Sequence, residues 1–271
     1  MSHALRRTYT HVFLMNLAIA DISFLICCVP FQAHKYASLA WTLGDASCKV
    51  IQYVTYVTLY VTIWTLVCIA ILRYYIVVRN KKRMTNIKSR SMVIFTGCLW
   101  LFISILNIPT ALSYEVRYSG SYTYCGMKED TTEYLIVTLS ITGYLLPLII
   151  VIAAYSSILY YLFAMEKGTK RRTRGLHAAK GILVVVASFT LAWLPFHIHA
   201  LISVYGSLPK GVPYEYVHVI WYFLAYSNSV VNSFIYNYVC KDFRNAFRKV
   251  LLCKEPKCSN STSKHHNIAQ L

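Results

Sequence analysis

Six long apolar stretches dominate this sequence and decide what it can fold into. Each contains about twenty or more residues with almost no charge, enough for an α-helix to cross roughly 30 Å of hydrocarbon. A membrane β-barrel would need short segments of alternating polarity, and runs such as residues 181–191 do not alternate. We therefore expect an all-α transmembrane bundle with six spans, at residues 11–33, 50–72, 92–112, 134–164, 181–204 and 217–239.

The composition also favours a bilayer as the main solvent. Apolar residues make up 57% of the chain and charged residues 14%, whereas an average soluble domain has roughly 25% charged residues. The formal net charge of +17 would suit a surface that binds nucleic acid, but the basic residues lie between the apolar runs. We therefore expect membrane lipid as a partner and no nucleic acid.

The basic residues predict the orientation, because lysine and arginine concentrate in the cytoplasmic segments of membrane proteins. Six crossings place both chain ends on one side. Of the 27 lysines and arginines, all lie on that side except Lys35, Lys49, Arg117, Lys128 and Lys210. We therefore expect both termini in the cytoplasm.

The nine cysteines are sorted by this topology. Only Cys48 and Cys125 are predicted to lie outside the cell, where conditions are oxidising, so we expect them to form a disulfide. That bond would tie residues 113–133 over the mouth of the bundle. No ligand spacing typical of a zinc site occurs in the chain.

Polar residues within the spans mark candidate sites, because they are costly in lipid. Asp21 is the only acidic residue near the centre of a span, and Asn228, Asn232 and Tyr236 recur at helical spacing in the sixth span. A carboxylate among hydroxyls and amides can hold a small cation such as sodium, or it can be protonated. The same groups can instead hydrogen-bond between helices and hold the bundle together. The two interpretations are compatible, and both remain open.

Aromatic residues gather toward the outer half of the fifth span. Trp193, Phe196 and His197 surround Pro195, which lacks an amide hydrogen and predicts a kink. Aromatic residues near a membrane surface are often belt residues. A deep histidine can bind a ligand or be a satisfied core residue.

The segment after the sixth span has an apolar face opposite basic residues. We expect residues 241–253 to form an amphipathic helix on the membrane surface, with Cys253 available for palmitoylation. Residues 254–271 are expected to be a disordered cytoplasmic tail.

Taken together, these features resemble the rhodopsin-like G-protein-coupled receptors over nearly the whole chain. The resemblance is to the galanin and allatostatin-A receptors in particular, at residues 30–33, 41–44 and 224–229. The family motifs that it matches are those of the second helix, the first outer loop, the fourth-helix tryptophan, the fifth-helix pair, CWxP and NPxxY, at residues 16–21, 41–48, Trp100, Pro147 with Tyr155, 192–195 and 232–236.

The resemblance implies a receptor of the plasma membrane in which an extracellular neuropeptide shifts an equilibrium between two states. The span that holds Trp193 and Pro195 would move outward and admit a heterotrimeric G protein. Thr55 stands where amine receptors carry an aspartate, which disfavours a biogenic amine. The implied ligand contacts are His197, Phe196, Tyr56, His218, Tyr222, Gln52, Thr55 and Glu215.

Two further sets of residues follow from the same resemblance. We expect no cofactor other than a structural sodium ion. We also expect that the chain can pair into a receptor dimer. The switch residues would be Trp193, Pro195, Arg73, Tyr155, Asn232 and Tyr236, and the sodium site would be formed by Asp21, Thr62, Asn228, Ser229 and Asn232.

The chain departs from the family pattern in three ways. The family has seven helices, and here the first helix is absent, so we expect an incomplete version of such a receptor. Leu72 replaces the acid that precedes Arg73, which leaves that arginine without its ionic partner. Ser233 replaces the proline of NPxxY and keeps an amide donor.

The leading functional interpretation is therefore signalling through a G protein on binding a neuropeptide. The alternative is a truncated, non-signalling partner that pairs with full-length receptors or retains them. A transporter is disfavoured because no inverted repeat is visible. We expect no enzymatic activity, because no base and nucleophile can be placed at one membrane depth.

Overall fold

The computed structural model describes residues 3–38, 40–79, 89–120, 122–165, 168–206 and 212–239. The expected amphipathic helix at 241–253, Cys253 and the tail at 254–271 lie outside the described residues. Residues up to Ile235 form one compact unit, and Tyr236 begins a second unit whose described part ends at Val239. All contacts given below lie within the first unit.

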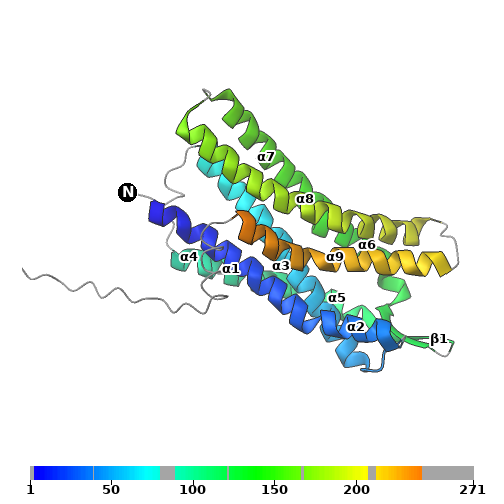
Figure 1. Cartoon of the computed structure of the whole chain (residues 1–271). Helices are drawn as coiled ribbons and strands as arrows, with labels where there is room; N and C mark the ends of the chain where they lie inside the picture. Colours follow the sequence, from blue (N-terminus) through cyan, green and yellow to red (C-terminus); the bar gives the residue numbers. More distant parts are fainter. Residues whose placement is uncertain are drawn as a thin grey trace, which may run out of the picture. The chain divides into compact units, whose positions relative to one another are not determined.

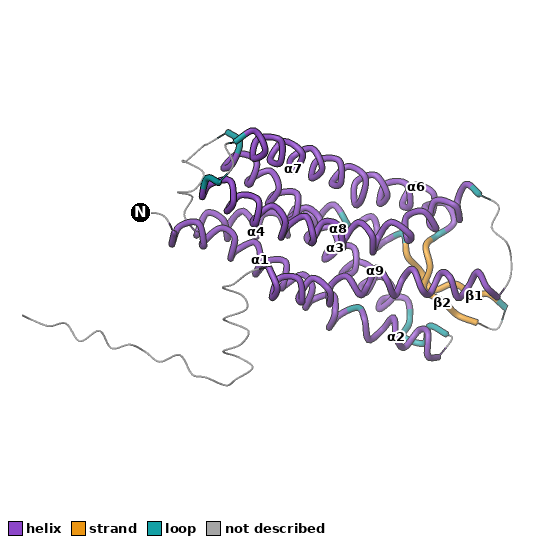
Figure 2. The backbone as a smooth tube through the Cα atoms, turned by 45° about the horizontal axis from the view of Figure 1, so that its top comes forward, coloured by secondary structure: helices purple, strands orange, loops and turns teal. Residues whose placement is uncertain are grey.

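Long helices run side by side through the first unit (Figure 1, Figure 2). The first two predicted spans correspond to α1 (His3–Cys27) with α2 (Val29–Ser38), and to α3 (Asp45–Val77). The third corresponds to α4 (Ser89–Leu106) with α5 (Ile108–Leu112), and the fourth to α6 (Glu129–Ser140), η2 (Ile141–Leu145) and α7 (Leu146–Ala164). The last two are α8 (Lys170–Tyr205) and α9 (Val212–Val239).

Among the residues that the structure describes, five helical segments are long and apolar enough to cross a membrane. The described part of α9 contributes a shorter apolar stretch, Val219–Val231. Many large apolar side chains face outward from these helices, among them Phe102, Ile149, Leu191 and Phe223. A surface of this kind suits hydrocarbon rather than water. The expected transmembrane helical bundle is confirmed.

A β-hairpin, which the sequence reading does not predict, lies at one end of the bundle (Figure 2). Strands β1 (Tyr114–Ser119) and β2 (Tyr122–Met127) pair antiparallel, with Tyr114 opposite Met127. Gly120 has φ 58° at the turn, a backbone conformation that glycine adopts without strain. We call this end of the bundle the hairpin end and the other the opposite end.

The helix that precedes α7 contains one turn of π-helix, η2. Such a turn inserts one extra residue and changes which side chains face each neighbouring helix. Tyr144 and Gly143 of this turn are both buried. The turn therefore sets which residues of this span face α3 and α8.

A buried polar network joins the first, second and third spans. The Nδ2 atom of Asn16 donates to the hydroxyl of Thr65 at 2.7 Å, and the indole of Trp100 donates to Oδ1 of Asn16 at 2.8 Å. Hydrogen bonds of this kind hold helices together in lipid, where water cannot replace them.

Candidate functional site

A small cavity lies among α1, α3, α8 and α9, near the middle of the bundle. Its lining includes Asp21, Thr62, Asn228 and Ser229, together with the ring of Trp193. These are four of the five residues expected at the sodium site, and the side chain of the fifth, Asn232, lies outside the description. The cavity volume of about 20 Å³ is roughly the space of one water molecule or one small ion.

The donor set suits a small hard cation. It combines one carboxylate, from Asp21, with the hydroxyls of Thr58 and Thr62 and the amide of Asn228. The Oδ1 atom of Asn228 is buried and has no hydrogen-bond partner in the described part of the chain. No cluster of three or more His, Cys, Asp or Glu that could hold a metal ion occurs among the described residues.

An aromatic cluster lies between this cavity and the hairpin. Phe196 packs edge-to-face on Trp193, with ring centroids 5.6 Å apart, and on Tyr222 at 5.1 Å. Tyr222 in turn contacts Tyr226 at 5.7 Å. The structure therefore brings together Phe196, Tyr222 and Trp193, three of the residues predicted from the sequence.

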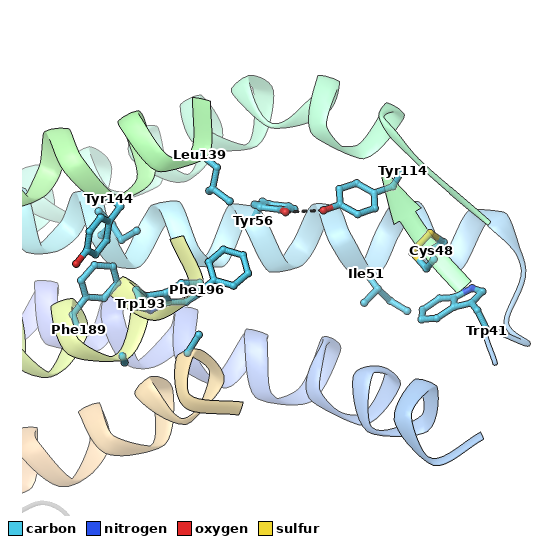
Figure 3. Close-up of a cluster of buried hydrophobic side chains, with 14 residues drawn as sticks. Trp41, Cys48, Ile51, Tyr56, Tyr114, Leu139, Tyr144, Phe189, Trp193 and Phe196 are labelled. Atoms are coloured by element: carbon cyan, nitrogen blue, oxygen red, sulfur yellow. Dashed lines mark hydrogen bonds between the residues drawn. A yellow bond between two sulfur atoms is a disulfide. The ribbon is translucent and has the colours of Figure 1, made fainter. Parts of the chain in front are cut away.

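The hairpin reaches down to this cluster through Tyr114 (Figure 3). The hydroxyls of Tyr56 and Tyr114 lie 2.7 Å apart, and both rings are buried. Burial raises the pKa of Tyr114 well above its usual value, so its phenol stays protonated at neutral pH. Tyr56 was predicted as a ligand contact from the sequence, whereas Tyr114 was not. The alternation of apolar or aromatic residues with polar ones in 114–118 and 122–125 is typical of hairpin strands and could have indicated it.

His197, a predicted ligand contact on α8, is buried. It is 4% exposed, its Nδ1 atom lies 3.2 Å from Oγ of Ser140, and its ring stacks on Tyr144 at 4.6 Å. The side chain of His197 therefore reaches from α8 to the α6–η2 segment.

The remaining predicted ligand contacts are divided. Gln52 lies beneath the disulfide, with Nε2 3.9 Å from Sγ of Cys125. The hydroxyl of Thr55 donates to the carbonyl of Ile51 in its own helix and also lines the small cavity. The side chains of Glu215 and His218 lie outside the description.

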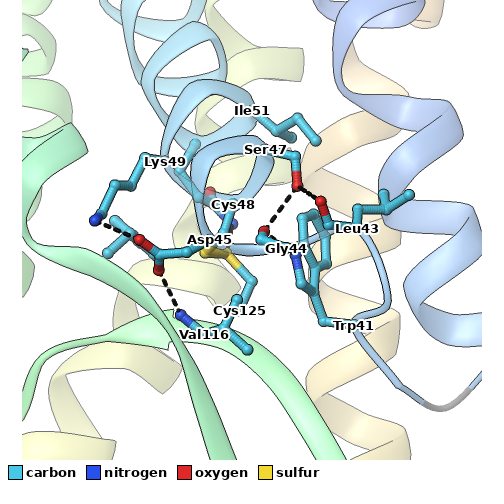
Figure 4. The surroundings of a disulfide bond; sticks show 12 residues. Trp41, Leu43, Gly44, Asp45, Ser47, Cys48, Lys49, Ile51, Val116 and Cys125 are labelled. Atoms are coloured by element: carbon cyan, nitrogen blue, oxygen red, sulfur yellow. Dashed lines mark hydrogen bonds and ion pairs between the residues drawn. A yellow bond between two sulfur atoms is a disulfide. The ribbon is translucent and has the colours of Figure 1, made fainter.

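The predicted disulfide between Cys48 and Cys125 is confirmed, and it fixes the hairpin to the start of α3 (Figure 4). The amide of Val116 donates to Asp45 at 3.0 Å, and Lys49 pairs with the same carboxylate at 2.5 Å. The amide of Trp41 donates to the carbonyl of Thr123 at 2.7 Å. The hairpin is therefore held over the aromatic cluster by covalent and hydrogen bonds.

Tyr155 and Arg73, two further predicted switch residues, lie at the opposite end. Tyr155 is buried in an apolar cluster with Val67 and Ile158, and its hydroxyl has no hydrogen-bond partner among the described residues. Arg73 is half-buried near the end of α3, and Leu72 packs instead against Phe13. The side chain of Tyr236 lies outside the description.

The chain is similar to one family of membrane receptors and to several of its members. Residues 1–236 match the family described as 7 transmembrane receptor (rhodopsin family). The galanin receptor type 1 of Homo sapiens is 32% identical over 262 residues, which cover 94% of this chain and 75% of the relative. The galanin receptor type 3 of Mus musculus is also 32% identical, over 90% of this chain and 68% of its own length. The allatostatin-A receptor of Bombyx mori is 28% identical, with coverages of 92% and 72%.

Proposed function

Because the chain belongs to the rhodopsin family of seven-transmembrane receptors, we propose that it binds a peptide of the galanin or allatostatin-A type and activates a heterotrimeric G protein. The identity to galanin receptor type 1 over nearly the whole chain is the observation that carries this proposal. The family is one of receptors and not of enzymes, as the sequence indicates.

The peptide would bind at the hairpin end, against the aromatic cluster and the Tyr56–Tyr114 pair. Phe196 and Tyr222 offer ring faces and edges, and the Tyr56–Tyr114 pair offers hydroxyls beside them. Mixed apolar and hydroxyl surfaces of this kind are typical of peptide and ligand sites. The other proposed contacts are His197, Gln52, Thr55, His218 and Glu215.

Binding would be passed on through Trp193, which touches both sites. Its ring packs on Phe196 and also lines the small cavity that contains Asp21. A peptide that binds one position of Phe196 better than another shifts the equilibrium of α8 by that difference in affinity. Outward movement of α8 about Pro195 would then open the opposite end to the G protein.

The small cavity would hold a sodium ion in the resting state. Asp21 supplies the negative charge, and Thr62, Ser229 and Asn228 supply neutral oxygens. The unpartnered Oδ1 of Asn228 supports this assignment.

The membrane setting follows from the same proposal. The chain is a multi-pass membrane protein, and we place it in the plasma membrane with the hairpin end outside and the C-terminus in the cytoplasm. The concentration of basic residues at the opposite end supports this orientation. Contact with lipid and pairing into dimers are further parts of the proposal.

Ligand-stimulated nucleotide exchange tests the function. Membranes from cells that express the chain are treated with galanin or allatostatin-A peptides, and GTP exchange on the G protein is measured. We expect saturable stimulation by at least one peptide. A flat response from a chain that reaches the cell surface would overturn the proposal and favour the non-signalling partner.

A matched pair of phenylalanines tests the site. Phe196→Ala removes a ring from the aromatic cluster, and we expect the potency of the peptide to fall at least about tenfold, which corresponds to about 1.4 kcal/mol. Phe223→Ala removes an exposed ring from the outside of α9 and should leave potency unchanged. Equal effects of the two substitutions would contradict the proposed site.

A further inference from the structure

Pro195 leaves a weak point in α8. Proline has no amide hydrogen, so Pro195 cannot donate to the carbonyl of Leu191 four residues earlier, and a proline ring inside a helix favours a bend at that point. In lipid, no water is available to hydrogen-bond to a carbonyl that the bend exposes. Groups on neighbouring helices that face this turn therefore influence how far α8 bends.

Tyr144 supplies such a group. Its hydroxyl donates to the carbonyl of Thr190 at 3.1 Å, one residue before the carbonyl that Pro195 leaves without its donor. Tyr144 is 3% exposed, so this hydrogen bond is shielded from solvent. The same ring lies beside Phe189 on α8, as Figure 3 shows.

The contacts continue on the other side of the proline. The ring of Tyr144 stacks on His197 at 4.6 Å with an interplanar angle of 29°, and Ser140 lies 3.2 Å from Nδ1 of the same histidine. Tyr144 and Ser140 therefore hold α8 both before and after Pro195. We call these three residues, Ser140, Tyr144 and His197, the hinge clasp.

The π-turn fixes the clasp to α3. The hydroxyl of Thr142 in this turn lies 2.7 Å from that of Tyr60 on α3. A Cβ atom added at Gly143 would lie 3.1 Å from Cδ1 of Leu139 in the same span and in ordinary contact, at 3.5 Å, with Tyr60 on α3. One face of the turn is thus attached to α3 while Tyr144 faces α8.

We propose that Tyr144 is a positioning residue that holds the part of α8 before Pro195 against η2 and so favours the resting state of the receptor. Outward movement of that part of α8 carries the carbonyl of Thr190 away from the Tyr144 hydroxyl. The hydrogen bond therefore opposes the movement. The link to signalling rests on the proposed function, whereas the restraint on α8 does not.

Tyr144→Phe tests the clasp with the smallest change, because it removes the hydroxyl and keeps the ring that stacks on His197. Hydrogen bonds between membrane helices contribute modestly, so we expect basal nucleotide exchange to rise about threefold to fivefold. Tyr134→Phe is the matched control. It removes a tyrosine hydroxyl from an exposed position on the same span, and basal exchange should stay at the parent level.

A distance measurement tests the restraint without peptide or G protein. Spin labels are placed at Thr173 on α8 and Ser91 on α4, both exposed, in a chain whose cysteines outside the disulfide are changed to serine. We expect Tyr144→Phe to increase the population with the longer distance several-fold, and Tyr134→Phe to leave it unchanged.

The distance and exchange measurements distinguish a failure of the clasp from a failure of the proposed function. An unchanged distance distribution in Tyr144→Phe, or an equal shift in Tyr134→Phe, would overturn the clasp. A shifted distribution supports the clasp even if no peptide activates the chain, in which case only the proposed function fails. A shifted distribution with unchanged or lower basal exchange in a peptide-responsive chain would overturn the assignment of the clasp to the resting state.

Discussion

The two ends of the bundle are held together in different ways. At the hairpin end, the disulfide, the paired strands and the hydrogen bonds of Asp45 and Trp41 join segments far apart in the sequence. At the opposite end, the described contacts of α3 with α7 are mainly apolar, through residues such as Val67, Val151 and Leu162.

The two ends therefore differ in how easily their side chains can move. Hydrogen bonds and disulfides have strict geometry, whereas apolar side chains can repack at similar volume with a smaller loss of free energy. The hairpin end is therefore suited to keep a binding surface in place. The opposite end is suited to change its packing, and Pro195 lies between the two.

Loss of the disulfide should have the largest effect. Cys48→Ser with Cys125→Ser opens a link across 77 residues, and we expect a loss of about 4 kcal/mol in stability with little receptor at the cell surface. Thermal unfolding of the purified protein and surface labelling measure the two effects. Cys98→Ser, at an exposed free cysteine, is the control. A double variant as stable as Cys98→Ser would show that the disulfide does not hold the hairpin end in place.

An acid at Leu72 should have the next largest effect. Leu72 is buried with Phe13 and Met92, so Leu72→Asp places a carboxylate in an apolar cluster and should cost about 3 kcal/mol or force its protonation. Leu72→Met keeps the volume and should cost less than about 1.5 kcal/mol. Melting temperatures of the two variants test this. Equal melting temperatures would show that the opposite end is not held by apolar packing at this site.

The tyrosine pair predicts a smaller, specific loss at the hairpin end. Tyr56→Phe leaves the hydroxyl of Tyr114 without its partner and should cost about 1 kcal/mol, whereas Tyr134→Phe at an exposed site should cost nothing. Because the pKa of Tyr114 is raised, the contribution of the pair is full below about pH 10, where free tyrosine ionises, and decreases at higher pH. The difference in melting temperature should therefore be constant from pH 6 to about pH 8. A difference that changes within this range would contradict the burial of the pair.

The ion pair on the hairpin should matter least. Arg117 contacts Glu129, whose side chain is exposed, and the pair raises the pKa of Arg117 above its usual value. Exposed pairs are screened by water and salt. Glu129→Gln should therefore leave the melting temperature unchanged within error. A loss comparable to that of the disulfide variant would show that surface charge, and not the buried links, holds this end.

The long helices could be predicted from the sequence because apolar length is a strong physical constraint in a membrane. Residues 50–72 and 92–112 both lie within the helical spans observed. The pairing of Cys48 with Cys125 followed from topology, since no other cysteines were expected outside. The grouping of Asp21 with Asn228 around one cavity also agrees with the cost of polar groups in lipid.

The local features around the hinge could not be predicted in the same way. The π-turn at 141–145 contains Thr142, Gly143 and Tyr144, but none of these residue types by itself marks an extra position in a helix. Tyr144 and Ser140 gain their significance only from contacts with α8, which the sequence does not display. Asn16 begins the second-helix motif at residues 16–21, but its hydrogen bonds to Thr65 and Trp100 depend on how three helices pack.

Two distances measured with and without peptide test the central claim most directly. One pair of spin labels, at Thr173 and Ser91, reports on the opposite end, and a second pair, at Ser203 and Ala46, reports on the hairpin end. The account predicts that a saturating activating peptide lengthens the first distance and leaves the second almost unchanged. A change confined to the hairpin end, or equal changes at both ends, would contradict it.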